Sequence, residues 1–326
     1  MIPISLLDLV PVRQGETLAS AFHETALTAR AAEKAGYRRY WVAEHHGMEG
    51  IAGGAASVVL AHIGNATSTI RIGAGGIMLP NHTPYVIAEQ FGTLAALFPG
   101  RVDLGLGRAP GADGRLAYAL RKDPRQAAEN FPQDVVELRA RFAGDPALPF
   151  PATQAVGADV EMWILGSSLF GAQLAGMLGL PYAFASHFAP ALLDQAAQVY
   201  RERFEPSATL DKPHFMAAIN VMCGDTDEEA WYLASSNDQS FVSLRSGNPG
   251  RLPPPVRGYR DTLDRSGMAL LEQMRSVSAI GSPSTVRAGI EDFVARTQAD
   301  ELIVSGSTYD PEAWRRSLAM TMEALR

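Results

Sequence analysis

The sequence predicts an α/β fold, a closed (β/α)8 barrel of the TIM type that forms a single domain over residues 1–326. Short apolar runs alternate about eight times with helical patterns, which implies parallel strands joined by right-handed crossovers. The chain has 326 residues, of which 47% are hydrophobic, enough to bury a large core. About eight such units at this length favour a closed barrel, with an open doubly wound sheet as the competing topology.

The first half of the chain is expected to supply four of these units. Leu18, Phe22 and Ala26 lie on one stripe of the first helix, and Gly36 is a natural stop. A polar, glycine-bearing stretch follows the fourth strand at residues 108–125. The expected strands cover residues 4–10, 40–43, 70–75 and 102–106, and the expected helices cover residues 15–36, 55–66, 85–98 and 130–142.

The second half repeats the pattern but is interrupted after its third strand. Pro253, Pro254 and Pro255 exclude regular secondary structure from their segment. An insertion at about 247–276 is therefore expected to contain a lid or a disordered loop. The expected strands cover residues 162–165, 182–185, 215–223 and 301–304, and the expected helices cover a stretch ending at 178 and residues 189–204, 225–246, 268–275, 284–297 and 311–325.

Composition and charge disfavour several classes of protein. The formal net charge is 28 − 35 = −7, which disfavours binding to nucleic acid or to anionic membranes. No apolar run approaches the ~20 residues of a membrane span, and Asp8 interrupts the apolar N-terminal run, which disfavours a signal peptide. A single cysteine, Cys223, fits a reducing compartment. We therefore expect a cytoplasmic protein.

Glu44, His45 and His46 follow the second expected strand, where a parallel barrel would open onto its catalytic face. Adjacent strand residues point to opposite faces, so one of the two histidines is expected to face away from the pocket. Taken alone, the pair fits an ordinary surface loop equally well. Together with His82 it shows no metal-ligand spacing such as H-E-x-x-H, so no metal site is predicted.

Two motifs have the chemistry of a phosphate site. Gly166, Ser167 and Ser168 lie between the fifth strand and a helix, where backbone N–H groups and hydroxyls can bind an anion, although a serine there can also be a simple N-cap. Arg108 ends the fourth strand and can bind a phosphate through two parallel hydrogen bonds, or it can be a solvated surface charge. Gly111 comes one residue late for a dinucleotide fingerprint, so no nicotinamide site is predicted.

The third expected strand contains Gly73, Gly75 and Gly76. Glycines weaken a buried strand unless a bulge or a closely approaching ligand needs the room. Either a β-bulge or a planar ring lying against the backbone would explain them.

These motifs, in this order, resemble the bacterial luciferase-like flavin monooxygenases, and the resemblance covers nearly the whole chain. The sequence looks closer to the non-luminescent members of that family, because Gly107 stands where luciferases carry a reactive cysteine. The motifs that carry the resemblance are Glu44-His45-His46, residues 73–80 with His82-Thr83-Pro84, residues 100–108, and Gly166-Ser167-Ser168 leading to residues 179–185.

The resemblance implies roles for particular residues. His45 matches the catalytic histidine of the family, and Glu44 would orient a neighbour. Arg108 and Ser168, with Ser167 and Gly166, match the phosphate site of FMN. Gly75-Gly76 matches a flavin-facing, non-proline cis peptide. A further hydroxyl that contacts phosphate in the family is replaced here by Gly171, which leaves the two serines and the backbone.

The resemblance also implies a reaction. Reduced FMN, supplied by a separate flavin reductase, would react with O2 to give a flavin 4a-peroxide that oxygenates a small organic substrate. Relatives that use a deazaflavin for hydride transfer, and relatives that bind flavin without catalysis, are the alternatives. A homodimer through the helices at 54–66 and 84–98 is expected as well, while the substrate itself cannot be identified from these loops.

Overall fold

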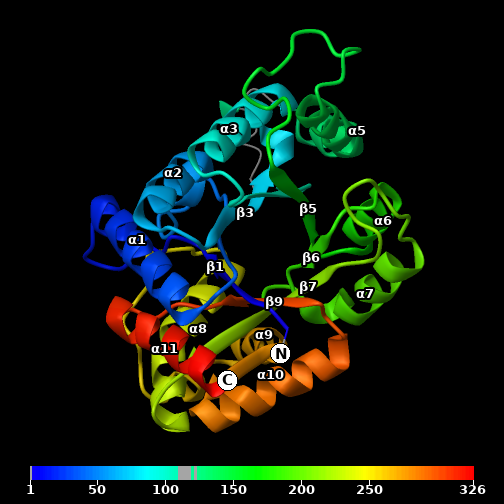
Figure 1. Cartoon of the computed structure of the whole chain (residues 1–326). Helices are drawn as coiled ribbons and strands as arrows, with labels where there is room; N and C mark the ends of the chain where they lie inside the picture. The colour runs from blue at the N-terminus through cyan, green and yellow to red at the C-terminus, as the bar shows by residue number, and fades with distance from the viewer. Residues whose placement is uncertain (1, 109–118, 121–122) are drawn as a thin grey trace.

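The computed structural model describes residues 2–108, 119–120 and 123–326, and nine parallel strands lie within these residues. Eight of them close a barrel in the order β1-β2-β3-β4-β5-β6-β7-β9, with β9 paired back to β1, and helices surround it (Figure 1). The predicted (β/α)8 barrel is confirmed. The strands are β1 (Ile4–Asp8), β2 (Arg39–Val42), β3 (Arg71–Met78), β4 (Val102–Gly107), β5 (Val160–Gly166), β6 (Tyr182–Phe184), β7 (Phe215–Cys223), β8 (Ser278–Gly281) and β9 (Glu301–Ser305).

The helices follow the strands as the apolar periodicity predicts. Most of the large buried side chains pack between the barrel and this outer layer. The helices are α1 (Leu18–Ala35), α2 (Ala56–Ala66), α3 (Pro84–Leu97), α5 (Pro124–Ala143), α6 (Leu169–Leu178), α7 (Leu193–Glu202), α8 (Asp227–Arg245), α9 (Arg265–Arg275), α10 (Pro283–Thr297) and α11 (Pro311–Ala324). Among the described residues, none of these helices is both long and apolar enough to cross a membrane.

Two expectations about secondary structure were wrong. The helix expected to begin at residue 130 begins at Pro124. Asp123 caps this earlier start by accepting from the N–H of Arg125 at 2.9 Å, and the helix continues through Pro132. Strand β8 was not expected. It has only four residues and pairs with the last four of β7, outside the closed barrel. Most of the polar stretch at 108–125 lies outside the described residues.

A layer of charged side chains fills the N-terminal end of the barrel. The Arg39 guanidinium lies 2.9 Å from Asp103, 3.0 Å from Glu161 and 2.9 Å from Glu301, and its side chain is 1% exposed. Above it, Trp41 donates its indole N–H to Asp103 at 2.9 Å, and Trp163 donates to Glu161 at 3.0 Å. The barrel is thus closed at this end, so a ligand site has to open at the carboxyl ends of the strands.

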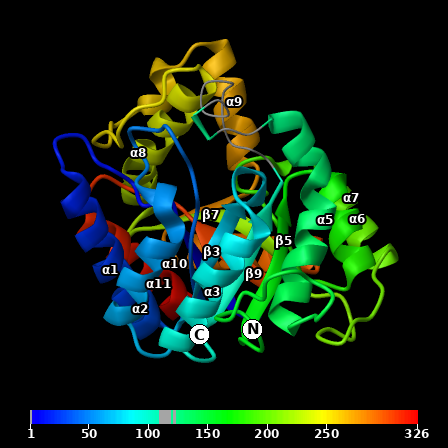
Figure 2. The same ribbon diagram turned by 90° about the horizontal axis from the view of Figure 1, so that it is seen from above.

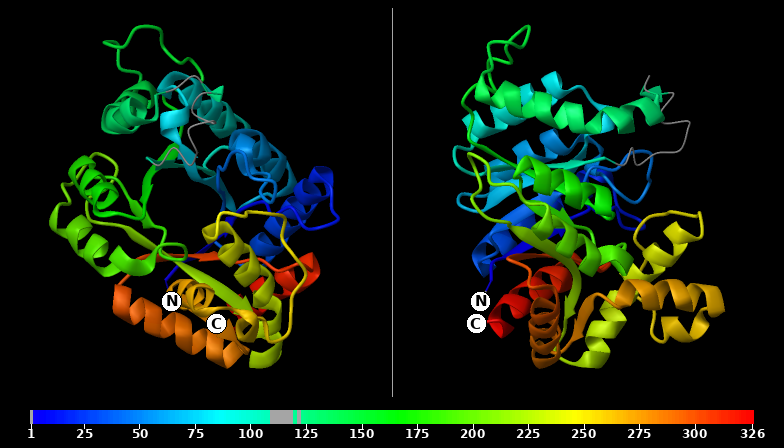
Figure 3. Two further views of the ribbon diagram at one scale, coloured as in Figure 1. Left: turned by 180° about the vertical axis from the view of Figure 1, so that it is seen from behind. Right: turned by 90° about the vertical axis from the view of Figure 1, so that its right-hand side faces the viewer.

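The segment between α8 and α9 lies at the end of the barrel opposite the two termini (Figure 2 and Figure 3). Leu252 exchanges backbone hydrogen bonds of 2.9 Å with Val12 and Gln14, in the loop after β1. Arg251 pairs with Glu49, in the loop after β2, at 2.8 Å. The predicted insertion therefore contacts the loops at the carboxyl ends of the strands, which is where a lid would have to lie.

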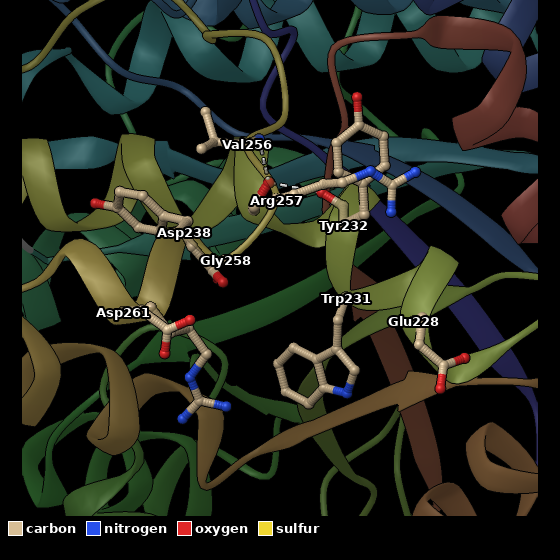
Figure 4. A pocket seen from close by; sticks show the side chains of 11 residues that line it. Glu228, Trp231, Tyr232, Asp238, Val256, Arg257, Gly258 and Asp261 are labelled. Atoms are coloured by element: carbon tan, nitrogen blue, oxygen red, sulfur yellow. Dashed lines mark hydrogen bonds between the residues drawn. The ribbon is translucent and has the colours of Figure 1, made fainter.

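A pocket of about 380 Å³ lies between α8 and the Val256–Asp261 part of the insertion (Figure 4). Trp231 and Tyr232 line it, with the guanidinium of Arg257 4.6 Å from the Tyr232 ring centre. None of the site residues predicted from the sequence lines this pocket. The pocket is therefore a feature of the insertion and not the candidate reaction site.

Candidate active site

The sequence-predicted residues come from the carboxyl ends of four neighbouring strands. Glu44 and His45 follow β2, Gly75 and Gly76 lie in β3, Arg108 follows β4, and the Gly166-Ser167-Ser168 segment ends β5. These strands are consecutive in the barrel. The fold thus brings residues that are far apart in the sequence to one end of the barrel.

Glu44 is held by hydrogen bonds to two imidazoles. Its side chain is 1% exposed, and its Oε1 lies 2.6 Å from Nε2 of His46 and 2.8 Å from Nε2 of His82. Its Oε2 accepts from the N–H of Met78 at 3.3 Å. Burial alone would raise the pKa of Glu44, but the hydrogen bonds and charges of His82 and His46 outweigh it and hold the pKa below its ordinary value. The side chain is therefore an ionised carboxylate.

His45 and His46 have different surroundings, although β2 ends at Val42 and both lie in the loop that follows it. The Nδ1 atom of His45 is buried and has no hydrogen-bond partner among the described residues. Burial lowers the pKa of His45, against the opposing charge of Glu44, so the ring is predominantly neutral at pH 7. A buried ring nitrogen without a partner is unusual in a folded protein and fits a group that contacts a ligand.

A second imidazole, His187, has the same property. It follows β6, which lies on the side of the barrel opposite β2, and its buried Nδ1 also has no partner within the described part of the chain. Burial and then the charge of His45 lower its pKa to about 4. Asn220 fixes this turn by donating its side-chain amide to the His187 carbonyl at 2.7 Å. The sequence analysis missed His187, although its position three residues past a strand end is a signal of the same kind as His45.

The glycines of β3 lie at an irregular point in the sheet. The β3–β4 register shifts between Ala74 and Ile77, and the Gly75-Gly76 peptide is cis. A Cβ on Gly76 would lie 2.7 Å from the carbonyl oxygen of Gly105, and one on Gly75 would lie 2.7 Å from a methyl group of Leu7. Packing between strands thus already requires glycine here. Both residues nevertheless remain partly exposed, which leaves their backbone accessible.

Arg108 lies beside the N-terminus of α6, where Ser168 precedes the helix. Ser168 occupies the N-cap position of α6, but its hydroxyl makes no capping hydrogen bond within the described residues. The Arg108 guanidinium lies 4.1 Å from the ring centre of Phe170, in the first turn of the same helix. A cation, a hydroxyl and the N–H groups of a helix N-terminus therefore share one place, which is the donor set that a phosphate requires.

The comparisons with known proteins agree with this geometry. The sequence profile of the family described as luciferase-like monooxygenase matches residues 3–301. The chain belongs to the luciferase-like monooxygenase family. It is 47% identical over 323 residues to a luciferase-like monooxygenase of Escherichia coli K12, covering 99% of this chain and 96% of that protein. It is 34% identical over 258 residues to the N-acetyl-S-alkylcysteine monooxygenase of Bacillus subtilis, covering 76% and 75%.

Solved structures share the fold over the full chain. Apo-MsnO8 is 30% identical with a TM-score of 0.87 and covers 99% of this chain and 98% of its own. The oxygenating constituent of 3,6-diketocamphane monooxygenase from Pseudomonas putida, solved with FMN, has 19% identity and a TM-score of 0.75, covering 100% and 98%. An F420-dependent secondary alcohol dehydrogenase has 15% identity and a TM-score of 0.71, covering 100% and 99%. This luciferase-like protein is an enzyme, a monooxygenase.

Proposed function

We propose that the enzyme uses reduced FMN, delivered by a separate flavin reductase, and O2 to oxygenate a small organic substrate. The observation that carries this proposal is the meeting of Arg108 with the uncapped N-terminus of α6, next to the accessible backbone at Gly75-Gly76. These features fit the two ends of a flavin mononucleotide, its phosphate and its planar ring. Bound reduced FMN supplies the two electrons with which O2 is activated.

The residues of this chain then have distinct tasks. Arg108, Ser167, Ser168 and the backbone from Gly166 onward bind the phosphate. Gly75 and Gly76 lie against the ring. His45 would accept or donate a proton at Nδ1, and the neutral imidazole of His187 would offer a hydrogen bond from the opposite side of the barrel. Glu44 acts through His46 and His82, the imidazoles that it contacts.

A deazaflavin is the second candidate cofactor. Its support is the similarity in fold to the F420-dependent alcohol dehydrogenase and a partial match, 32% identical over 128 residues, to the F420-dependent hydroxymycolic acid dehydrogenase of Mycobacterium tuberculosis. The reaction would then be hydride transfer without O2. The much longer matches to monooxygenases favour FMN.

Titration with FMN and with F420, followed by flavin absorbance or fluorescence, tests the cofactor. We expect FMN to bind and Ser168→Ala to weaken binding about tenfold, the effect of one hydrogen bond to a charged group. The same variant should keep its stability within about 0.5 kcal/mol, because the hydroxyl caps no N–H. Thr17→Ala is the control. Its hydroxyl accepts from the N–H of Ser20 at 3.1 Å, so it should lose about 1 kcal/mol and keep its FMN affinity. Tight F420 binding without FMN affinity would overturn the proposal.

We also propose a homodimer through α2 and α3. Val58 on α2 is 68% exposed, and Leu97 and Val86 on α3 are 58% and 43% exposed, although all three are large apolar side chains. Burying these three side chains in a dimer interface would remove their apolar surface from water. Light scattering at micromolar concentration is expected to show a dimer and Leu97→Asp to shift it toward the monomer. A monomeric wild-type protein would contradict this.

The proposed setting is the cytoplasm, where a flavin reductase and O2 are available. The single cysteine, which is buried at the end of β7, supports a reducing compartment. We further propose that the whole chain forms one domain, with the segment at about 247–276 as its lid. The contacts of Arg251 and Leu252 with the loops after β1 and β2 support that assignment.

A further inference from the structure

We propose that Glu44, His46 and His82 bind one divalent transition-metal ion at the ends of β2 and β3. The three side chains come from two separate segments of the chain, and their ligand atoms all lie within 4.8 Å of one another. Two imidazoles and one carboxylate are the ligand set of open sites for Zn²⁺, Fe²⁺ or Co²⁺, in which water or a further ligand completes the coordination.

The distances fit an ion after small movements. Metal–ligand bonds of about 2.1 Å place two ligands about 3 Å apart at a right angle and about 4.2 Å apart on opposite sides of the ion. The Oε1–Nε2 distances of 2.6 Å to His46 and 2.8 Å to His82 lie slightly below the right-angle value. The ligand atoms of the two imidazoles lie within 4.8 Å of each other, so they would have to approach by at most about 0.6 Å to reach the separation of opposite ligands. The partly buried rings of His46 and His82 would make these movements, while the buried Glu44 stays in place.

Charge and exposure also suit a cation. The carboxylate of Glu44 is buried against both imidazoles and a backbone N–H, so the cluster contains one acidic ligand. The N–H of Met78 holds its second oxygen in place, which is the kind of outer contact that orients a metal ligand. His46 and His82 have side chains 18% and 27% exposed, so an ion can reach their Nε2 atoms from solvent.

Binding would replace two hydrogen bonds with three coordination bonds. Each imidazole now directs its Nε2 at Glu44, and a neutral ring becomes a ligand when the Nε2 proton is carried by Nδ1 instead. The ion would then tie the loop after β2 to η2 (Leu79–Asn81), the turn that precedes His82. The metal site does not depend on the identity of the flavin.

Titration of the untagged full-length protein with Co²⁺ tests the proposal, because bound Co²⁺ absorbs visible light. We expect one Co²⁺ per chain, competition by Zn²⁺, and binding at least a hundredfold weaker in His82→Ala and in Glu44→Gln. The second variant keeps the shape of Glu44 and a hydrogen-bond acceptor, so it should fold even if His82→Ala does not. His23→Ala, on the exposed face of α1, is the control and should bind as the wild type does. Absence of stoichiometric binding to the wild type, or binding unchanged in Glu44→Gln, would show that the cluster is only a hydrogen-bonded clamp.

Discussion

Replacing Arg39 with methionine is expected to lower the free energy of unfolding by about 3–5 kcal/mol, a large part of the stability of a typical domain. Arg39 neutralises Asp103 and Glu301, whose side chains are fully buried, at 2.9 Å each. Methionine fills much of the same space but removes the charge. The two carboxylates then remain inside the barrel with fewer partners, and the cost of burying them is no longer offset.

Urea unfolding followed by two independent probes measures this effect. Arg287→Met is the matched control, since Arg287 pairs with Glu291 on the surface of α10 and both side chains are about half exposed. An exposed pair of this kind contributes about 0.3–0.5 kcal/mol. A loss below about 1 kcal/mol in Arg39→Met would mean that water or a rearranged Arg71, which also contacts Asp103, compensates for the missing guanidinium.

The sequence predicts the barrel because its signals are local. Apolar runs of four to nine residues alternate with helical stripes, and Gly36, Gly144 and Gly179 end helices in the left-handed conformation. Length does not explain why β8 escapes prediction, because β2 and β6 have four and three residues and were expected. The segment Ser278–Gly281 contains only two apolar residues, and it forms a strand by pairing with the last four residues of β7. Local pattern thus misses an element that exists only through a tertiary partner.

The residues of the candidate site also differ in whether local sequence patterns predict them. Arg108 and Ser168 can be found from strand ends and helix starts. Strand alternation does not place His45 and His46, because β2 ends at Val42 and both lie in the following loop. The hydrogen bonds of Glu44 with His46 and His82 cannot be predicted from such local signals. His82 is 38 residues away and reaches Glu44 only after β3 and η2 have formed. The same holds for the charged layer around Arg39, whose partners are 64, 122 and 262 residues away in the sequence.

Replacing His45 with alanine is expected to reduce substrate oxygenation by about 10²–10⁴-fold, the range contributed by a positioned acid or base. The reason is the buried Nδ1 of His45, a proton-binding atom left without a partner at the end of β2. FMN affinity should change little, because the phosphate contacts proposed above would lie at the ends of β4 and β5. The measurement is product formation with reduced FMN, O2 and a flavin reductase, using a substrate found by screening a panel of small organic compounds.

His23→Ala is the control for the loss of an imidazole, since that side chain is exposed on α1, and it should leave the rate unchanged. If His45→Ala oxygenates substrate as fast as the wild type, the proton chemistry belongs to another group. His187 is then the first candidate, because within the described part of the chain it carries another buried, unpartnered ring nitrogen, on the opposite side of the barrel. A rate that falls only in His187→Phe would move the acid–base role from β2 to β6. A fall in both variants would mean that the two imidazoles act on the same bound molecule from opposite sides.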